Sequence, residues 1–145
     1  PAYKGITLAS ATASALSDKY DIDKPFAFNR KESKAHGEGG CVVGANLKGK
    51  VLIIDDVITA GTAVREAYDL IISEGASVAG LVISMDRQER GKSKISATGE
   101  LEQELNSPVM SIASLEDLIF FIKKDENLKS HLPNLIEYHS KYSSL

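Results

Sequence analysis

The chain has 145 residues, of which 43% are hydrophobic and 26% charged, and its formal net charge is −3. This length and composition are typical of one globular domain, and they exclude a disordered or collagen-like chain. The acidic balance argues against a general nucleic-acid binder, and the single cysteine, Cys41, excludes an internal disulfide framework. Because no apolar run reaches spanning length, we expect a cytoplasmic protein with no membrane partner.

Helical and strand-like patterns alternate along the chain, which predicts an α/β domain with a parallel sheet. We find no repeat or linker and expect one domain over residues 1–145. In chain order, the first part of the pattern predicts a helix (5–17), a strand (25–28), a polar, glycine-rich mobile loop (30–40) and a brief strand (41–44). The middle part predicts a strand buried on both faces (51–54), a loop (57–62), a helix ending near Glu74 with Gly75 as its stop, a second buried strand (78–85) and a loop (86–98). The last part predicts a short helix (99–106), a strand (109–112), a helix (115–123) opened by a capping box at 114–117, and a closing helical segment (127–142) interrupted near Pro133.

The most informative stretch is residues 51–63, where an aliphatic strand ends in Asp55 and Asp56 and a small, hydroxyl-rich loop leads into a helix. In open α/β sheets, the C-terminal ends of the strands face the ligand crevice. Backbone N–H groups of residues 59–63 and the positive end of the helix suit a phosphate dianion. The two acids suit hydroxyl donors, such as those of a ribose, or a metal, and beneath a ribose they would stabilise positive charge developing at its C1. Either half alone would be only a strand end or a helix cap, but together they indicate a ribose 5-phosphate site.

This stretch resembles the signature of the type I phosphoribosyltransferases, in which a hydrophobic strand and two acids precede a Thr-Ala-Gly-Thr loop. The resemblance implies their fold, a doubly wound, mainly parallel sheet flanked by helices. It also implies binding of phosphoribosyl pyrophosphate (PRPP). The residues implied to bind it here are Asp55, Asp56, Val57, Ile58, Thr59, Ala60, Gly61, Thr62 and Ala63.

A second stretch, residues 28–40, gathers basic side chains on a glycine-rich loop. Cations on a movable loop suit a departing pyrophosphate, although an isolated cluster of this kind is more often a solvated surface loop. The string resembles the catalytic loop of orotate phosphoribosyltransferases, which closes over the neighbouring subunit's active site and so implies a homodimer. The resemblance implies catalytic roles for Lys34 and His36 beside Asp55 and Asp56. The further PRPP contacts that it implies are Tyr3, Lys4, Arg30 and Lys31, together with Lys34 and His36.

The third stretch, residues 86–91, follows the second buried strand. An arginine is the planar, bidentate partner that the carboxylate of orotate requires. A salt bridge from Arg87 to Asp86 or Glu89 is the alternative, and the residues alone leave both open. The Asp-Arg-Gln-Glu run resembles the strand-end motif of the orotate enzymes and implies that Arg87, with Thr59, holds orotate.

The resemblance implies transfer of the phosphoribosyl group from PRPP to orotate in pyrimidine biosynthesis, giving orotidine 5′-monophosphate and pyrophosphate. Mg²⁺ is expected to be carried mainly by the PRPP phosphates, with no direct protein ligand. The chain opens on Pro1 without the N-terminal hood that family members carry, so we expect that a segment is missing and leave the activity of this chain by itself open. The alternatives are a purine or uracil phosphoribosyltransferase, or a non-catalytic nucleotide-sensing regulator, which would need a basic face.

Overall fold

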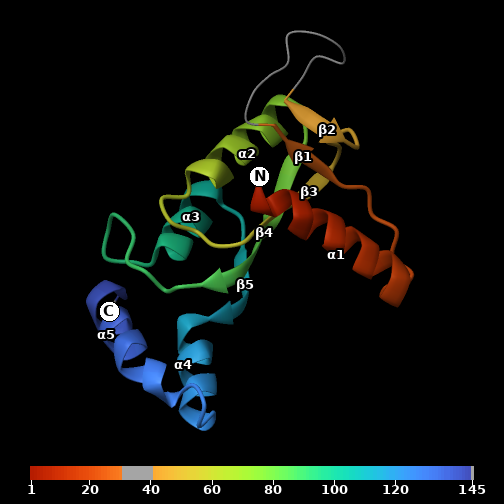
Figure 1. Ribbon diagram of the computed structural model, residues 1–145. Coiled ribbons are helices and arrows are strands. Elements are labelled where there is room, and N and C mark those ends of the chain that lie inside the picture. The colour runs from red at the N-terminus through yellow and green to blue at the C-terminus, as the bar shows by residue number, and fades with distance from the viewer. Residues whose placement is uncertain (31–40, 145) are drawn as a thin grey trace. The chain divides into compact units, whose positions relative to one another are not determined.

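The computed structural model describes residues 1–30 and 41–144. The chain divides into two compact units, which we describe separately. Unit 1 comprises Pro1–Asp56 and Thr62–Leu81, and unit 2 comprises Val57–Gly61 and Val82–Leu145. Figure 1 labels the elements of both units. Among the described residues, no helix has the length and apolar character that crossing a membrane requires.

Unit 1 joins helices to short strands. Its elements are α1 (Lys4–Tyr20), β1 (Ala27–Asn29), β2 (Val42–Gly44), β3 (Lys50–Asp55), α2 (Thr62–Ser73) and the first half of β4 (Ser77–Asp86). Strands β1 and β2 form an antiparallel pair in which Phe28 lies opposite Val43, and α1 packs against β1 and β3. On α2, Val64, Ala67 and Ile71 recur at helical spacing and are buried.

The prediction that β3 is buried on both faces is wrong at Leu52. This side chain is 46% exposed, whereas the neighbouring Ile53 is only 4% exposed. Successive side chains of a strand point to opposite faces of the sheet. The described part of unit 1 therefore covers the face that carries Ile53 and leaves the face that carries Leu52 partly open.

Unit 2 contains the second half of β4, followed by four helical elements and one strand. These are α3 (Ala97–Leu105), β5 (Val109–Ser114), α4 (Leu115–Lys124), the 3-10 helix η1 (Lys129–His131) and α5 (Leu132–Tyr142). The strand order of the larger sheet is β3-β4-β5. The buried side chains of the unit include Ile58, Ile83, Leu101, Leu105, Leu115, Ile119 and Ile122.

Helix boundaries in unit 2 follow local sequence signals. The predicted capping box is confirmed: the Ser114 hydroxyl accepts a hydrogen bond from the Asp117 backbone N–H at 3.1 Å, and the Asp117 carboxylate accepts one from the Ser114 N–H at 2.8 Å. The closing helical segment is interrupted where the prediction placed it: the 3-10 helix η1 ends at His131, and α5 begins at Leu132, directly before Pro133. Pro133 lies in the first turn of α5, where its missing N–H would have had no helical partner.

Candidate active site

The C-terminal end of β3, in unit 1, carries the two predicted acids. Asp55 Oδ1 accepts a hydrogen bond from the backbone N–H of Asp56 at 2.9 Å, and Lys4 Nζ donates to Asp56 Oδ2 at 2.5 Å. The Lys4 side chain is 75% exposed and that of Asp56 is 25% exposed, so the ion pair lies at the surface. Water screens such a pair, and little free energy is needed to separate it when a ligand arrives.

The two acids sit in different electrostatic surroundings. Burial raises the pKa of the Asp55 carboxyl, and its hydrogen bond from the Asp56 N–H opposes that effect. The hydrogen bond to Asp56 raises the pKa of Lys4, which keeps the ammonium charged at neutral pH. This corner of unit 1 thus offers carboxylates for hydroxyl donors and a nearby cation for an anion.

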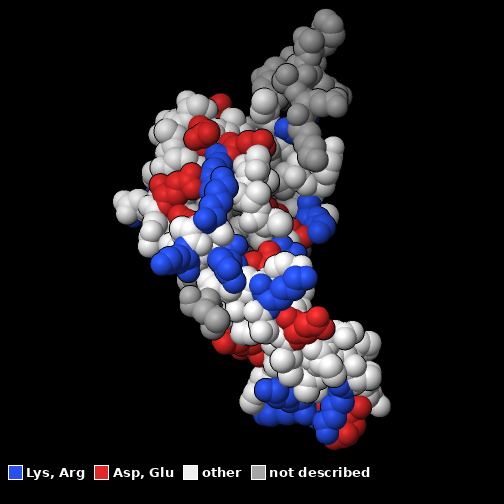
Figure 2. Space-filling model, turned by 90° about the vertical axis from the view of Figure 1, so that its left-hand side faces the viewer, with Lys and Arg blue, Asp and Glu red and all other residues white. Residues whose placement is uncertain are grey.

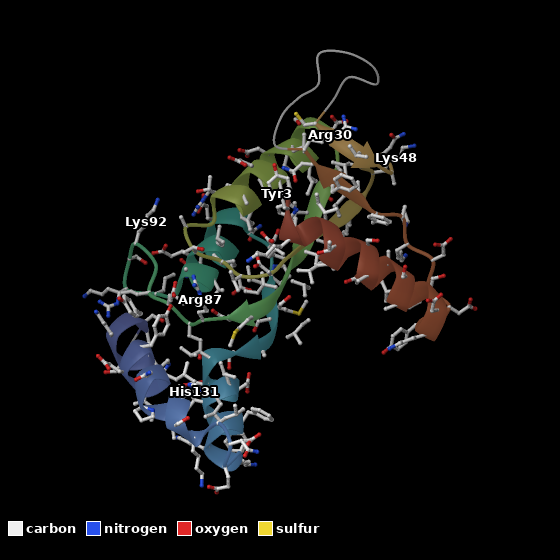
Figure 3. All side chains as sticks on the ribbon, in the orientation of Figure 1. Tyr3, Arg30, Lys48, Arg87, Lys92 and His131 are labelled. Carbon is white, nitrogen blue, oxygen red and sulfur yellow. The ribbon has the colours of Figure 1, made fainter. Side chains whose placement is uncertain are left out.

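Helix α1 approaches β3 closely at Gly5, which is buried. A Cβ atom at this position would lie 2.8 Å from the carbonyl oxygen of Ile54 and 3.6 Å from Asp55 Oδ1. The absence of a side chain lets the start of the helix lie against the end of the strand. Tyr3, labelled in Figure 3, and Lys4 stand at this start, so Gly5 is what brings Lys4 within reach of Asp56.

We expect Gly5→Ala to lower the free energy of unfolding by about 1–3 kcal/mol, the usual cost of forcing an extra methyl into a packed site. Alanine favours helix formation over glycine, so propensity alone predicts the opposite sign. Urea unfolding measures the change, and Ser14→Ala at an exposed position of α1 is the matched control. A Gly5→Ala protein as stable as the parent would contradict the close approach.

The residues that follow Asp56 in the chain form a loop assigned to unit 2. Ile58 is only 6% exposed and anchors the loop, whereas Thr59 and Ala60 are exposed. Gly61 is buried with φ of +72°, in the left-handed region that favours glycine. Small exposed residues between buried anchors, directly before a helix, are what a backbone phosphate site requires.

Arg87 directly follows β4 in unit 2 (Figure 3). Its Nη2 donates to Glu89 Oε2 at 3.0 Å and to the carbonyl oxygen of Ile58 at 3.4 Å. Of the two salt bridges that the sequence allowed, the one to Glu89 is present, while Asp86 Oδ1 accepts from the Gln88 backbone N–H at 2.8 Å. The Arg87 side chain is 31% exposed, so the ion pair leaves part of it open to solvent.

Comparison with known proteins assigns the chain to a family. Residues 1–106 match the family model described as the phosphoribosyl transferase domain. Over 142 residues the chain is 55% identical to the orotate phosphoribosyltransferase of Pseudomonas syringae pv. tomato, an alignment that covers 98% of this chain and 67% of that protein. The orotate phosphoribosyltransferase of Escherichia coli O139:H28 is 50% identical over the same shares of the two chains. The chain belongs to the orotate phosphoribosyltransferase family.

A solved structure supports the same assignment. The crystal structure of the orotate phosphoribosyltransferase from Francisella tularensis matches with a TM-score of 0.80 at 43% identity, over 99% of this chain and 68% of that one. The predicted fold class is therefore confirmed: this is the α/β fold of the type I phosphoribosyltransferases, with a parallel sheet flanked by helices.

The loop that resembles the catalytic loop of orotate phosphoribosyltransferases is described only at its two ends. The backbone N–H of Arg30 donates to the carbonyl oxygen of Cys41 at 2.8 Å, next to the pairing of Asn29 with Val42. The strands β1 and β2 thus bring the two ends of the loop together. The predicted site residues within it, Lys31, Lys34 and His36, lie outside the described residues.

Sequence reasoning did not identify two features of this chain. It assigned Lys4 to PRPP without its ion pair to Asp56, and it assigned no role to Tyr138, whose hydroxyl donates to Glu89 Oε1. The two residues of each pair lie about fifty positions apart along the chain, so no local pattern could have revealed the contact. Within residues 1–30 and 41–144, no group of three or more His, Cys, Asp or Glu side chains could hold a metal ion.

Proposed function

We propose that this chain is the catalytic core of an orotate phosphoribosyltransferase, which transfers the phosphoribosyl group of PRPP to orotate. The observation that carries the proposal is the contact of Arg87 Nη2 with the carbonyl oxygen of Ile58, at 3.4 Å within unit 2. This contact holds Arg87, a side chain of the kind that binds carboxylates, against the loop that carries Thr59. Orotate has the carboxylate that adenine, guanine and uracil lack, so an arginine at this place favours orotate.

In the proposed reaction, the bond between ribose C1 and a pyrophosphate oxygen breaks, and its electron pair leaves with pyrophosphate. N1 of orotate then bonds to C1, and its proton passes to the departing pyrophosphate. Asp55 and Asp56 hold the ribose hydroxyls and stabilise the positive charge that develops at C1. The backbone of residues 59–63, with Val57, Ile58 and the hydroxyl of Thr62, binds the 5′-phosphate, while Thr59 and Arg87 orient the base.

Cations complete the proposed site at the pyrophosphate end. Arg30, Lys31, Lys34 and His36 neutralise the leaving group, and Lys4 exchanges its bond to Asp56 for one to PRPP, with Tyr3 beside it. Mg²⁺ in proteins keeps several waters and binds through one or two carboxylates plus substrate phosphates. We propose that the metal enters with PRPP, is carried mainly by its phosphates with no direct protein ligand, and balances their charge.

The proposed enzyme is a cytoplasmic homodimer in which the loop over residues 30–40 serves the neighbouring subunit's site. The support is the resemblance of residues 28–40 to the catalytic loop of the orotate enzymes. Figure 2 shows Lys and Arg interspersed with Asp and Glu on the face that it presents, and the net charge is −3. This mixture favours a metabolic enzyme over a regulator that binds nucleic acid through phosphate contacts.

The test is a comparison of product formation from PRPP with orotate, uracil, adenine or guanine, using the full-length protein that contains this chain. Turnover of orotate alone is the expected result. Arg87→Ala should raise the KM for orotate about 100-fold, or about 2.7 kcal/mol, because a charged, bidentate contact is lost. The KM for PRPP should stay within about threefold if the arginine touches only the base.

Arg87→Lys separates charge from geometry, because lysine keeps the cation but lacks the planar fork. It should recover only part of the orotate affinity. Equal turnover of uracil and orotate by the parent protein would contradict the proposed substrate.

A further inference from the structure

The carboxylate of Glu89 links Arg87 to the C-terminal helix of unit 2. Its Oε2 accepts the hydrogen bond from Arg87 Nη2 at 3.0 Å, and its Oε1 accepts one from the hydroxyl of Tyr138. Each oxygen of the carboxylate therefore has a different donor. Glu89 is only 18% exposed, so few water molecules compete for these bonds.

Backbone contacts fix how the end of α5 aligns with the segment after Arg87. The N–H of Arg90 donates to the carbonyl oxygen of Tyr142 at 2.8 Å, and Glu89 forms an antiparallel bridge with Ser143. The guanidinium of Arg90 also bonds the carbonyl oxygen of Ser143, at 3.2 Å from Nη2. Ser143 is 7% exposed. Tyr138 therefore reaches Glu89 from a helix whose end is tied to the same segment.

A carboxylate beside a guanidinium can accept one hydrogen bond or two parallel ones. In this structure Glu89 accepts a single hydrogen bond from the guanidinium of Arg87. The Nε of Arg87 is buried without a hydrogen-bond partner among the described residues. An unsatisfied buried donor is costly, so Nε and Nη2 together are a strong attraction for both oxygens of Glu89. The Tyr138 hydroxyl opposes that arrangement, because it occupies the second oxygen.

We infer that Tyr138 is a positioning residue for recognition of the base. Acting through Glu89, it holds the guanidinium of Arg87 in the orientation that a substrate carboxylate requires. It also keeps Glu89 from accepting two hydrogen bonds from the guanidinium, which would neutralise more of its charge. This inference rests on the proposed function. Without the hydroxyl, Glu89 would turn to grip Nε and Nη2 together, and the guanidinium would meet the substrate carboxylate misoriented and more fully neutralised.

Tyr138→Phe in the full-length protein tests this inference with the smallest possible change. We expect the KM for orotate to rise about tenfold, as for the loss of about 1.4 kcal/mol, with kcat and the KM for PRPP within about twofold. Tyr142→Phe is the matched control: it makes the same change on the same helix, in a ring whose centroid is 4.8 Å from that of Tyr138. It should leave all three constants unchanged.

A double-mutant cycle shows whether Tyr138 acts through Glu89. Glu89→Ala alone should also raise the orotate KM selectively, and adding Tyr138→Phe should have no further effect, because the two residues then form one unit. Additive effects would overturn the inference. So would a Tyr138→Phe protein whose orotate KM is unchanged, or one in which the KM values for orotate and PRPP rise equally.

Glu89→Gln gives a second route if Tyr138→Phe does not fold. The amide has one oxygen, which cannot accept from both donors in the observed way. A selective rise in the orotate KM supports the inference, and no rise overturns it. Failure of the parent protein to convert orotate would instead overturn the proposed function itself, so the two failures are distinguishable.

Discussion

Replacing Lys34 with alanine in the full-length protein is expected to lower kcat for orotate about 10³-fold, comparable to the loss of a preorganised group that stabilises transition-state charge. The reason is chemical: negative charge gathers on pyrophosphate as its bond to C1 breaks, and an ammonium on the loop over residues 30–40 neutralises it. Ground-state PRPP carries most of that charge already and has other cationic partners. Its affinity should therefore stay within about tenfold.

Single-turnover kinetics measure the chemical step, and titration calorimetry with PRPP measures binding. Lys48→Ala is the matched control, since it removes an exposed lysine outside the proposed site (Figure 3). If Lys34→Ala turned over orotate at the parent rate, the loop would have no place in the mechanism.

The double replacement Asp55→Asn with Asp56→Asn should weaken PRPP binding about 100-fold and lower kcat further. Asparagine keeps the size of each side chain but removes the charge, so the ribose hydroxyls lose charge-assisted acceptors. The positive charge at C1 loses its stabilising partners as well. Lys4 also loses its ion pair with Asp56. That release works against the expected result, because a freed cation would favour PRPP.

Calorimetry with PRPP, in the presence of Mg²⁺, measures the change. Asp69→Asn, at an exposed position of α2, makes the same chemical replacement away from the proposed site and should bind PRPP normally. Intact binding by the double variant would remove the ribose assignment, and with it the central role of the end of β3.

Most of the fold could be predicted from short-range patterns. The helical spacing of Val64 and Ile71, the stop at Gly75 and the capping box at Ser114 lie within a few residues of the structure that they specify. The strand-acid-loop order over residues 51–63 has the same local character. The family and its PRPP signature could therefore be identified from the sequence.

Tertiary structure alone decided which side chains meet. Leu52 and Ile53 are both aliphatic, yet only packing determined that the first is exposed and the second buried. The sequence also left the partners of Lys4 and Glu89 undetermined, because many charged and hydroxyl groups could have paired with each. The approach of α1 at Gly5 and the docking of the end of α5 selected Asp56 and Tyr138. Periodicity encodes the local backbone, whereas contacts between distant positions depend on how the finished elements pack.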